Sequence, residues 1–128
     1  MDTIGDFIIR LKNAGAVAHE SVSLPHSKLK EAVANKLLAA GYLASVEVKG
    51  KDAKRVLVVG LKYEGGKSVI NDVARVSKPG RRLYTKVEDI YPVKFGKGHL
   101  ILSTPKGILT DKEAREARVG GEQLFKIW

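Results

Sequence analysis

The sequence predicts an α+β protein, in which an N-terminal α/β half of helix, strand, helix and hairpin packs beside a C-terminal half of antiparallel strands with a short helix. Three observations lead to this class. Apolar residues recur at helical spacing in two stretches before residue 42. From there on, short apolar runs alternate with turns rich in glycine and proline. Paired glycines at 65 and 66 interrupt the pattern, so we expect sub-domains at residues 1–66 and 67–128.

The N-terminal half is expected to open with an amphipathic helix that ends near Gly15. Its apolar face has the i, i+3, i+4, i+7 spacing of a single helix stripe, and it consists of Ile4, Phe7, Ile8 and Leu11. Alternating Val22 and Leu24 then predict a short strand, which follows a turn after the helix.

A second helix and a β-hairpin complete this half. Ser27 has the side chain of a helix N-cap, and Gly41 is a typical C-terminal stop. The predicted apolar face between them consists of Leu29, Ala32, Val33, Leu37 and Ala40. Alternation around residues 46–48 predicts the first hairpin strand, residues 50–54 the turn, and residues 56–61 a buried return strand.

The C-terminal half begins with an ambiguous segment that leads into a turn. Residues 69–76 fit either a helix or a strand. Lys78, Pro79 and Gly80 follow, with proline and glycine in the positions that a type II turn requires. Residues 81–84 then predict the start of a strand that carries two arginines.

A hairpin, a short helix and a last strand are predicted next. Residues 100–104 and 108–109 are the hairpin strands, and residues 105–107 form the tight turn between them. Thr110 and Glu113 have the spacing of a capping box, which predicts a helix that runs to about Val119. Two glycines then end this helix, and residues 123–128 are long enough for a final strand.

Charge and composition point to a polyanionic partner. The chain has 23 Lys and Arg against 14 Asp and Glu, a net charge of +9 on 128 residues. This excess favours a polyanion as the partner, either nucleic acid or a charged membrane surface, and the second half of the chain is the more basic one. A hydrophobic content of 44% is enough for a core. The absence of cysteine excludes disulfide scaffolds and cysteine zinc sites, and it fits a reducing, cytoplasmic compartment.

Signals for export, membrane insertion and catalysis are weak. The N-terminus has acid where a signal peptide needs base, and no apolar run approaches the ~20 residues of a membrane helix. His19, His26 and His99 lack metal-ligand spacing. Gly66-Lys67-Ser68 lacks the first glycine of a phosphate-binding loop, and Gly96-Lys97-Gly98 lacks the third glycine of a dinucleotide fingerprint. We therefore predict no enzymatic activity, no cofactor and no metal.

Two turns in the basic half carry groups suited to RNA. The first turn is surrounded by three cations, Lys78, Arg81 and Arg82. The second combines two hydroxyls with a tight bend, and it consists of Ser103, Thr104, Pro105, Lys106 and Gly107. Hydroxyl, backbone N–H and ammonium groups can donate to phosphates, 2′-hydroxyls and base edges. Tyr84 fits either a base-stacking role or a place in the core.

Two other functional classes compete with RNA binding. A DNA-binding helix-turn-helix needs a short turn between its helices, whereas residues 17–25 separate the two predicted helices here. A small RNA hydrolase needs paired acid and base groups, and the candidates near the basic turns are Glu88, Asp89 and His99.

Several segments carry a family resemblance. The longest runs from Gly98 to Leu109 and continues through Thr110-Asp111 and Ala114-Arg115. The shorter ones are Asp2 to Ile4 with Asp6, Ile9 to Asn13, Ser27 to Lys30, Ser77 to Tyr84, Gly120 to Glu122, and Trp128. Together they resemble the bacterial-type small-subunit ribosomal protein eight family over essentially the whole chain and in the same order.

The resemblance implies a primary rRNA-binding protein without a catalytic role, which works in the cytoplasm on the small ribosomal subunit. Such a protein binds the central domain of the 16S rRNA and supports assembly of the subunit platform. The resemblance also implies contacts with the small-subunit proteins numbered five and twelve, no membrane association, and a monomer when free. Some relatives repress translation by binding their own mRNA, so a repressor or another RNA-binding module is the alternative function.

The site residues that the resemblance implies lie in both halves. The main rRNA contacts fall on the loop from Ser103 to Gly107 and on Tyr84. Glu122 is implied to accept a hydrogen bond from a base or to hold the loop. The N-terminal half adds Thr3, Arg10, Asn13, Lys28 and Lys30. Many relatives have serine where this chain has Pro105, so one hydroxyl and one backbone donor are missing from the loop.

Overall fold

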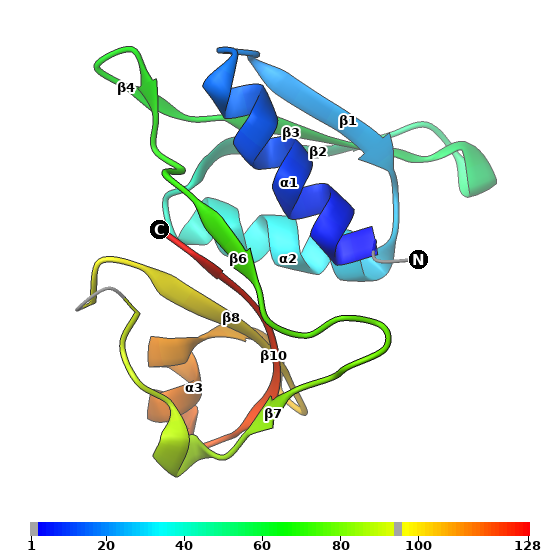
Figure 1. The fold of residues 1–128 in the computed structure, drawn as a ribbon. Coiled ribbons are helices and arrows are strands. Elements are labelled where there is room, and N and C mark those ends of the chain that lie inside the picture. The colour runs from blue at the N-terminus through cyan, green and yellow to red at the C-terminus, as the bar shows by residue number, and fades with distance from the viewer. Residues whose placement is uncertain (1–2, 94–95) are drawn as a thin grey trace. The chain divides into compact units, whose positions relative to one another are not determined.

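The structure is a computed structural model that describes residues 3–93 and 96–128 (Figure 1). The described residues form three α-helices and antiparallel sheets, which confirms the predicted α+β class. The chain divides into two compact units. One is Asp6–Asn71, and the other is Asp72–Trp128 together with the N-terminal residues up to Gly5. The sub-domain border at residues 66 and 67 stays a prediction, because compactness does not show which segments fold independently.

The unit Asp6–Asn71 consists of two helices and a three-stranded antiparallel sheet, followed by a small hairpin. The sheet order is β1-β3-β2, and α2 packs on β2 and β3. In chain order the elements are α1 (Thr3–Ala16, whose first residues belong to the other unit), β1 (Ser21–Pro25), α2 (Lys28–Ala39), β2 (Leu43–Lys49), a 3-10 turn (Asp52–Lys54), β3 (Val56–Leu61), β4 (Tyr63–Glu64) and β5 (Lys67–Ser68). These elements confirm the predicted helix, strand, helix and hairpin.

Helix α2 begins and ends as predicted but buries a different face. The Ser27 hydroxyl accepts a hydrogen bond from the Lys30 N–H at 3.1 Å, and Gly41 has a φ of +92° just after the helix. The predicted face is wrong at Leu29, which is 40% exposed. The buried residues are Lys30, Val33, Ala34 and Leu37, which have the i, i+3, i+4, i+7 spacing of one stripe. Leu29 lies beside this stripe, and Lys30 places its aliphatic stem on it.

The unit that contains Asp72–Trp128 is built around one five-stranded antiparallel sheet. Strand β10 lies at its centre, because it pairs with β8 on one side and with both β6 and β7 on the other. The elements are β6 (Val73–Arg75), β7 (Tyr84–Thr85), a 3-10 turn (Val87–Asp89), β8 (His99–Thr104), β9 (Gly107–Thr110), α3 (Asp111–Ala117) and β10 (Gly121–Ile127). The ambiguous segment 69–76 therefore contains a strand.

Helix α3 is short, and its N-terminus is closed as predicted. The Thr110 hydroxyl accepts from the Glu113 N–H at 3.2 Å, and the Glu113 carboxylate accepts from the Thr110 N–H at 3.1 Å. These two bonds form the capping box. Below the helix lies an apolar cluster that joins it to β8, and its buried members are Ile90, Val93, Leu100, Leu102 and Ala114.

The turn after β6 is present, but its predicted type is wrong. Lys78 and Arg81 exchange two backbone hydrogen bonds of 2.9 Å each, so Pro79 and Gly80 form the bend. A type II turn needs a positive φ at the position of Gly80, and Gly80 does not have one. The paired bonds between Lys78 and Arg81 close the turn without that conformation.

In the part of the chain that the structure describes, no helix combines the length and the apolar character needed to cross a membrane.

We expect Ser27→Ala to lower the free energy of unfolding by about 1 kcal/mol, because the Lys30 N–H loses its capping acceptor. Urea denaturation followed by circular dichroism measures this loss. Ser23→Ala is the matched control, since Ser23 is an exposed serine of β1. Equal stability of the two variants would show that the cap does not stabilise α2.

Candidate nucleic-acid interface

A row of side chains crosses the sheet of the C-terminal unit from β7 to β9. Tyr84 is paired with Glu122, and Glu122 is paired in turn with Ser103. Ser103 is paired with Ile108 on the next strand. Residues directly opposite one another in antiparallel strands place their side chains on the same face. Leu102, next to Ser103 in β8, belongs to the apolar cluster below α3. Because neighbouring residues of a strand point to opposite faces, the row lies on the face of the sheet opposite that cluster.

Gly120 and Gly121 allow the three strands to come this close. A Cβ atom on Gly120 would lie 2.2 Å from the Thr85 carbonyl oxygen. A Cβ atom on Gly121 would lie 2.2 Å from the Ser103 carbonyl oxygen. Both contacts involve backbone atoms, which cannot move aside as a flexible side chain can. The glycine pair therefore fixes Glu122 between Tyr84 and Ser103.

A buried serine holds the segment that leads into Tyr84. The Ser77 side chain is fully buried, accepts from the Leu83 N–H at 2.9 Å and donates to the Leu83 carbonyl at 3.2 Å. The Gln123 N–H of β10 also donates to that carbonyl, at 2.8 Å. The sequence reasoning missed this role of Ser77. Tyr84, which follows, is 69% exposed, so the alternative that places it in the core is wrong.

The two hydroxyls of the β8–β9 hairpin have different surroundings. The Thr104 hydroxyl donates to the Gly107 carbonyl at 2.8 Å and accepts from the Lys106 N–H at 3.1 Å. It therefore holds the turn, in which Gly107 has a φ of +105°. The Ser103 hydroxyl has no hydrogen-bond partner among the residues that the structure describes. Pro105 and Lys106 are exposed at the tip.

An ion pair ties the row to the basic turn. The Arg82 guanidinium lies 3.3 Å from both carboxylate oxygens of Glu122. The Glu122 side chain is 13% exposed and that of Arg82 is 59% exposed, so the pair is partly desolvated. Lys78 and Arg81 are exposed, and neither has an ion-pair partner within residues 3–93 and 96–128. The sequence reasoning did not find this pair, because 40 residues separate its members.

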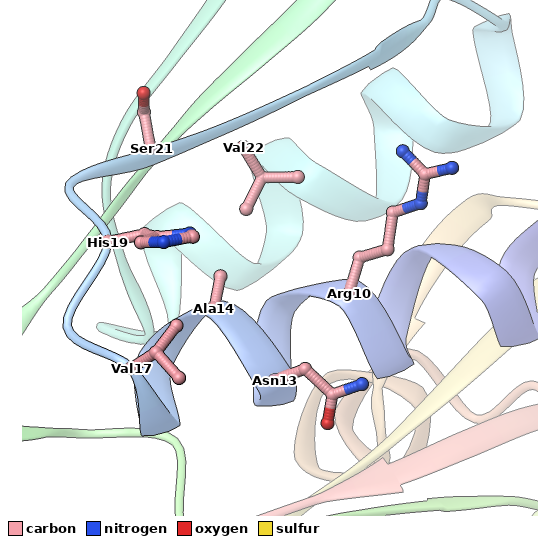
Figure 2. A pocket seen from close by; sticks show the side chains of 7 residues that line it. All are labelled: Arg10, Asn13, Ala14, Val17, His19, Ser21 and Val22. Atoms are coloured by element: carbon pink, nitrogen blue, oxygen red, sulfur yellow. The ribbon is translucent and has the colours of Figure 1, made fainter.

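The candidates of the unit Asp6–Asn71 lie on its two helices. Arg10 and Asn13 are exposed on α1 and border one groove between α1 and β1, as Figure 2 shows. Arg10 also pairs with Asp6 at 3.3 Å. On α2, Lys28 is exposed, whereas Lys30 is only 8% exposed. The remaining candidate, Thr3, belongs to the other unit and is exposed at the start of α1.

The chain is similar to one known protein family over almost its whole length. The family described as Ribosomal protein S8 matches residues 2–128. The chain belongs to the ribosomal protein S8 family. This membership confirms the resemblance found in the sequence, and it agrees with the expectation of a ribosomal protein rather than an enzyme.

Three relatives show the same similarity. Small ribosomal subunit protein uS8 of Dictyoglomus thermophilum is 50% identical over 127 residues, which cover 99% of this chain and 97% of the relative. The uS8 protein of Mycoplasmopsis synoviae is 50% identical over 129 residues, with the same two coverages. The uS8 protein of Acinetobacter baylyi is 49% identical over 123 residues, which cover 96% of this chain and 94% of the relative.

In this ribosomal protein S8 chain we expect Gly121→Ala to lower the free energy of unfolding by about 1–3 kcal/mol, because the added methyl meets the Ser103 carbonyl. Urea denaturation measures the loss, and amide NMR shifts of Tyr84 and Ser103 report the separation of the strands. Gly80→Ala is the matched control, since a Cβ there meets nothing within 4 Å and its φ is not positive. A Gly121→Ala protein as stable as Gly80→Ala would contradict the close-approach argument.

Proposed function

We propose that this chain is a structural constituent of the small ribosomal subunit, which binds the central domain of the 16S rRNA directly and supports assembly of the subunit platform. Family membership supports the subunit assignment, because the relatives are named as small-subunit proteins. The observation that carries the RNA-binding part is the row on β7, β10 and β8, where exposed Tyr84 and the Ser103 hydroxyl lie on either side of Glu122.

Exposed cations provide the part of the affinity that is independent of RNA sequence. Lys78 and Arg81 lie at one turn and Lys106 lies at the tip of the β8–β9 hairpin, all of them exposed. Lysine and arginine neutralise phosphates and release counterions, which raises affinity for any polyanion and makes it depend on salt. In the other unit, Lys28 and Arg10 have this role in the proposal.

The uncharged groups of the row provide discrimination. The Ser103 hydroxyl can both donate and accept, so it suits a 2′-hydroxyl or a base edge. The exposed ring of Tyr84 can stack on a base. Glu122 holds Arg82 in this proposal and keeps a carboxylate beside both groups. Because Pro105 has no N–H and the Lys106 N–H is bound by Thr104, side chains rather than these two amides make the contacts at the tip.

The remaining proposed contacts follow from the family resemblance. Thr3, Arg10, Asn13, Lys28 and Lys30 form a second set of rRNA contacts, in which the burial of Lys30 leaves Lys28 as the more accessible cation of α2. The neighbouring proteins are those numbered five and twelve in the small subunit. The place of action is the ribosome in the cytoplasm.

We expect Ser103→Ala to weaken binding to a central-domain rRNA fragment by about 1–3 kcal/mol without changing the dependence on salt, because the hydroxyl contributes discrimination and no charge. Filter binding at several salt concentrations measures both quantities. Lys106→Ala is the matched comparison at the same hairpin, and it should flatten the salt slope by about one unit.

Preference for the rRNA fragment over duplex DNA of equal length tests the proposal as a whole. Equal affinity for the two nucleic acids, or full affinity of Ser103→Ala for the fragment, would remove the assigned role of the row. Turnover of single-stranded RNA would instead support the hydrolase alternative.

Arg81 and Arg82 should differ although they are neighbours. Arg81→Ala should flatten the salt slope by about one unit, because its charge is not compensated by a carboxylate in the described structure. Arg82→Ala should flatten it by less, because Glu122 already compensates that charge. The same filter-binding series measures both slopes. Equal slopes for the two variants would show that the ion pair opens when RNA binds.

A further inference from the structure

The groove between α1 and β1 has a composition that the proposed contacts leave unexplained. Figure 2 shows Ala14 near its centre with Val22 on the β1 side, Asn13 and Val17 on the α1 side, and Arg10 and His19 at opposite ends. Its lining therefore combines an aliphatic floor with an amide, a guanidinium and an imidazole. No carboxylate is among the described residues that line it.

Both walls of the groove are fixed by hydrogen bonds. Ala18 has a φ of +59°, and the His19 N–H donates to the Ala14 carbonyl at 3.0 Å while the Ala18 N–H donates to Gly15, which is a Schellman closure of α1. The Tyr63 hydroxyl donates to the His19 carbonyl at 2.5 Å. On the other side, all five residues of β1 are paired with β3. The groove is therefore present before any ligand arrives.

Exposed apolar surface in the groove points to a ligand with a flat apolar face. Val17 is 63% exposed, more than any other of the larger aliphatic side chains that the structure describes. Guanidinium and imidazole planes stack on nucleobases, and an amide can donate to and accept from a base edge. A nucleobase matches all of these groups, whereas a bare phosphate would leave the aliphatic floor of the groove without a contact.

The shallowness of the groove decides between a free ligand and a tethered one. Five of its seven lining residues are exposed, namely Arg10, Asn13, Val17, His19 and Ser21. A free small molecule needs a site that buries most of its surface, and this groove cannot do so. A nucleobase of an RNA that is already bound elsewhere on the protein needs much less buried surface, because tethering raises its effective concentration.

We propose that this groove binds one unstacked nucleobase of the bound RNA, with its ring on Ala14, Val17 and Val22 and its edge toward Asn13. The inference rests on the proposed rRNA-binding function and adds a ligand class for a surface that charge alone does not explain. Arg10 and His19 close the two ends of the base site.

Photo-crosslinking in the full-length chain tests this inference. Benzoylphenylalanine replaces Val17 in one protein and Val48 in the other, because Val48 is a 40%-exposed valine on β2 outside the groove. Each protein is bound to the central-domain rRNA fragment and irradiated. We expect position 17 to crosslink to one nucleotide that is unpaired in the fragment, and position 48 to give no such product. In parallel, Asn13→Ala should weaken binding about tenfold at an unchanged salt slope.

The possible failures are distinguishable. If the wild-type protein prefers the rRNA fragment but position 17 crosslinks no more than position 48, or only to paired nucleotides, the base site is overturned and the proposed function stands. A groove that holds a protein segment would give the same negative result on RNA. If the wild-type protein shows no preference for the fragment, the proposed function fails, and the base site fails with it.

Discussion

The close approach of β10 to β7 and β8 is the constraint on which the C-terminal unit depends. Gly120 and Gly121 stand where any side chain would meet a backbone carbonyl, so the strands can reach hydrogen-bonding distance only with glycine there. Pairing at this point sets the register of Glu122, and that register brings a tyrosine and a serine from distant parts of the chain to its two sides. The ion pair to Arg82 then links the basic turn to the same place.

The hydroxyl groups of this unit show how fold and binding share one type of side chain. Ser77, Thr104 and Thr110 each hold backbone groups of a loop, a turn or a helix end. No buried side-chain polar atom of the described residues lacks a partner. Ser103 lies in the same sheet, but the described structure gives its hydroxyl no internal task. A hydroxyl that the fold does not use is available to a partner without any loss of internal hydrogen bonds.

Local signals predicted most elements, whereas the site depends on contacts between distant segments. The caps at Ser27 and Thr110 and the hairpin turn before Gly107 were predictable because each involves residues only a few positions apart. The error at Leu29 arose because a leucine at the edge of a helix stripe has the same local pattern as one at its centre. The Arg82–Glu122 pair and the exposure of Tyr84 follow from strand pairing across the unit, which the local pattern does not encode. The Ser77 hydroxyl bonds to Leu83 only six residues away, but the Ser77 N–H is held by the Gln123 carbonyl of β10, which is distant in the sequence.

The central position of β10 also has a consequence for the order in which the chain acquires its structure during synthesis. The strands of the unit Asp6–Asn71 pair only with one another, so that unit has all its sheet partners once residue 71 has been made. In the other sheet, β6, β7 and β8 all pair with β10, which is the last of the described strands to be made. Until then β6 and β7 have no strand partner among the described strands and β8 is paired only with β9, so the edges that face β10 stay open. The row of Tyr84, Glu122 and Ser103 therefore cannot form before Glu122 has been made, whereas all the residues that line the α1–β1 groove are made well before it.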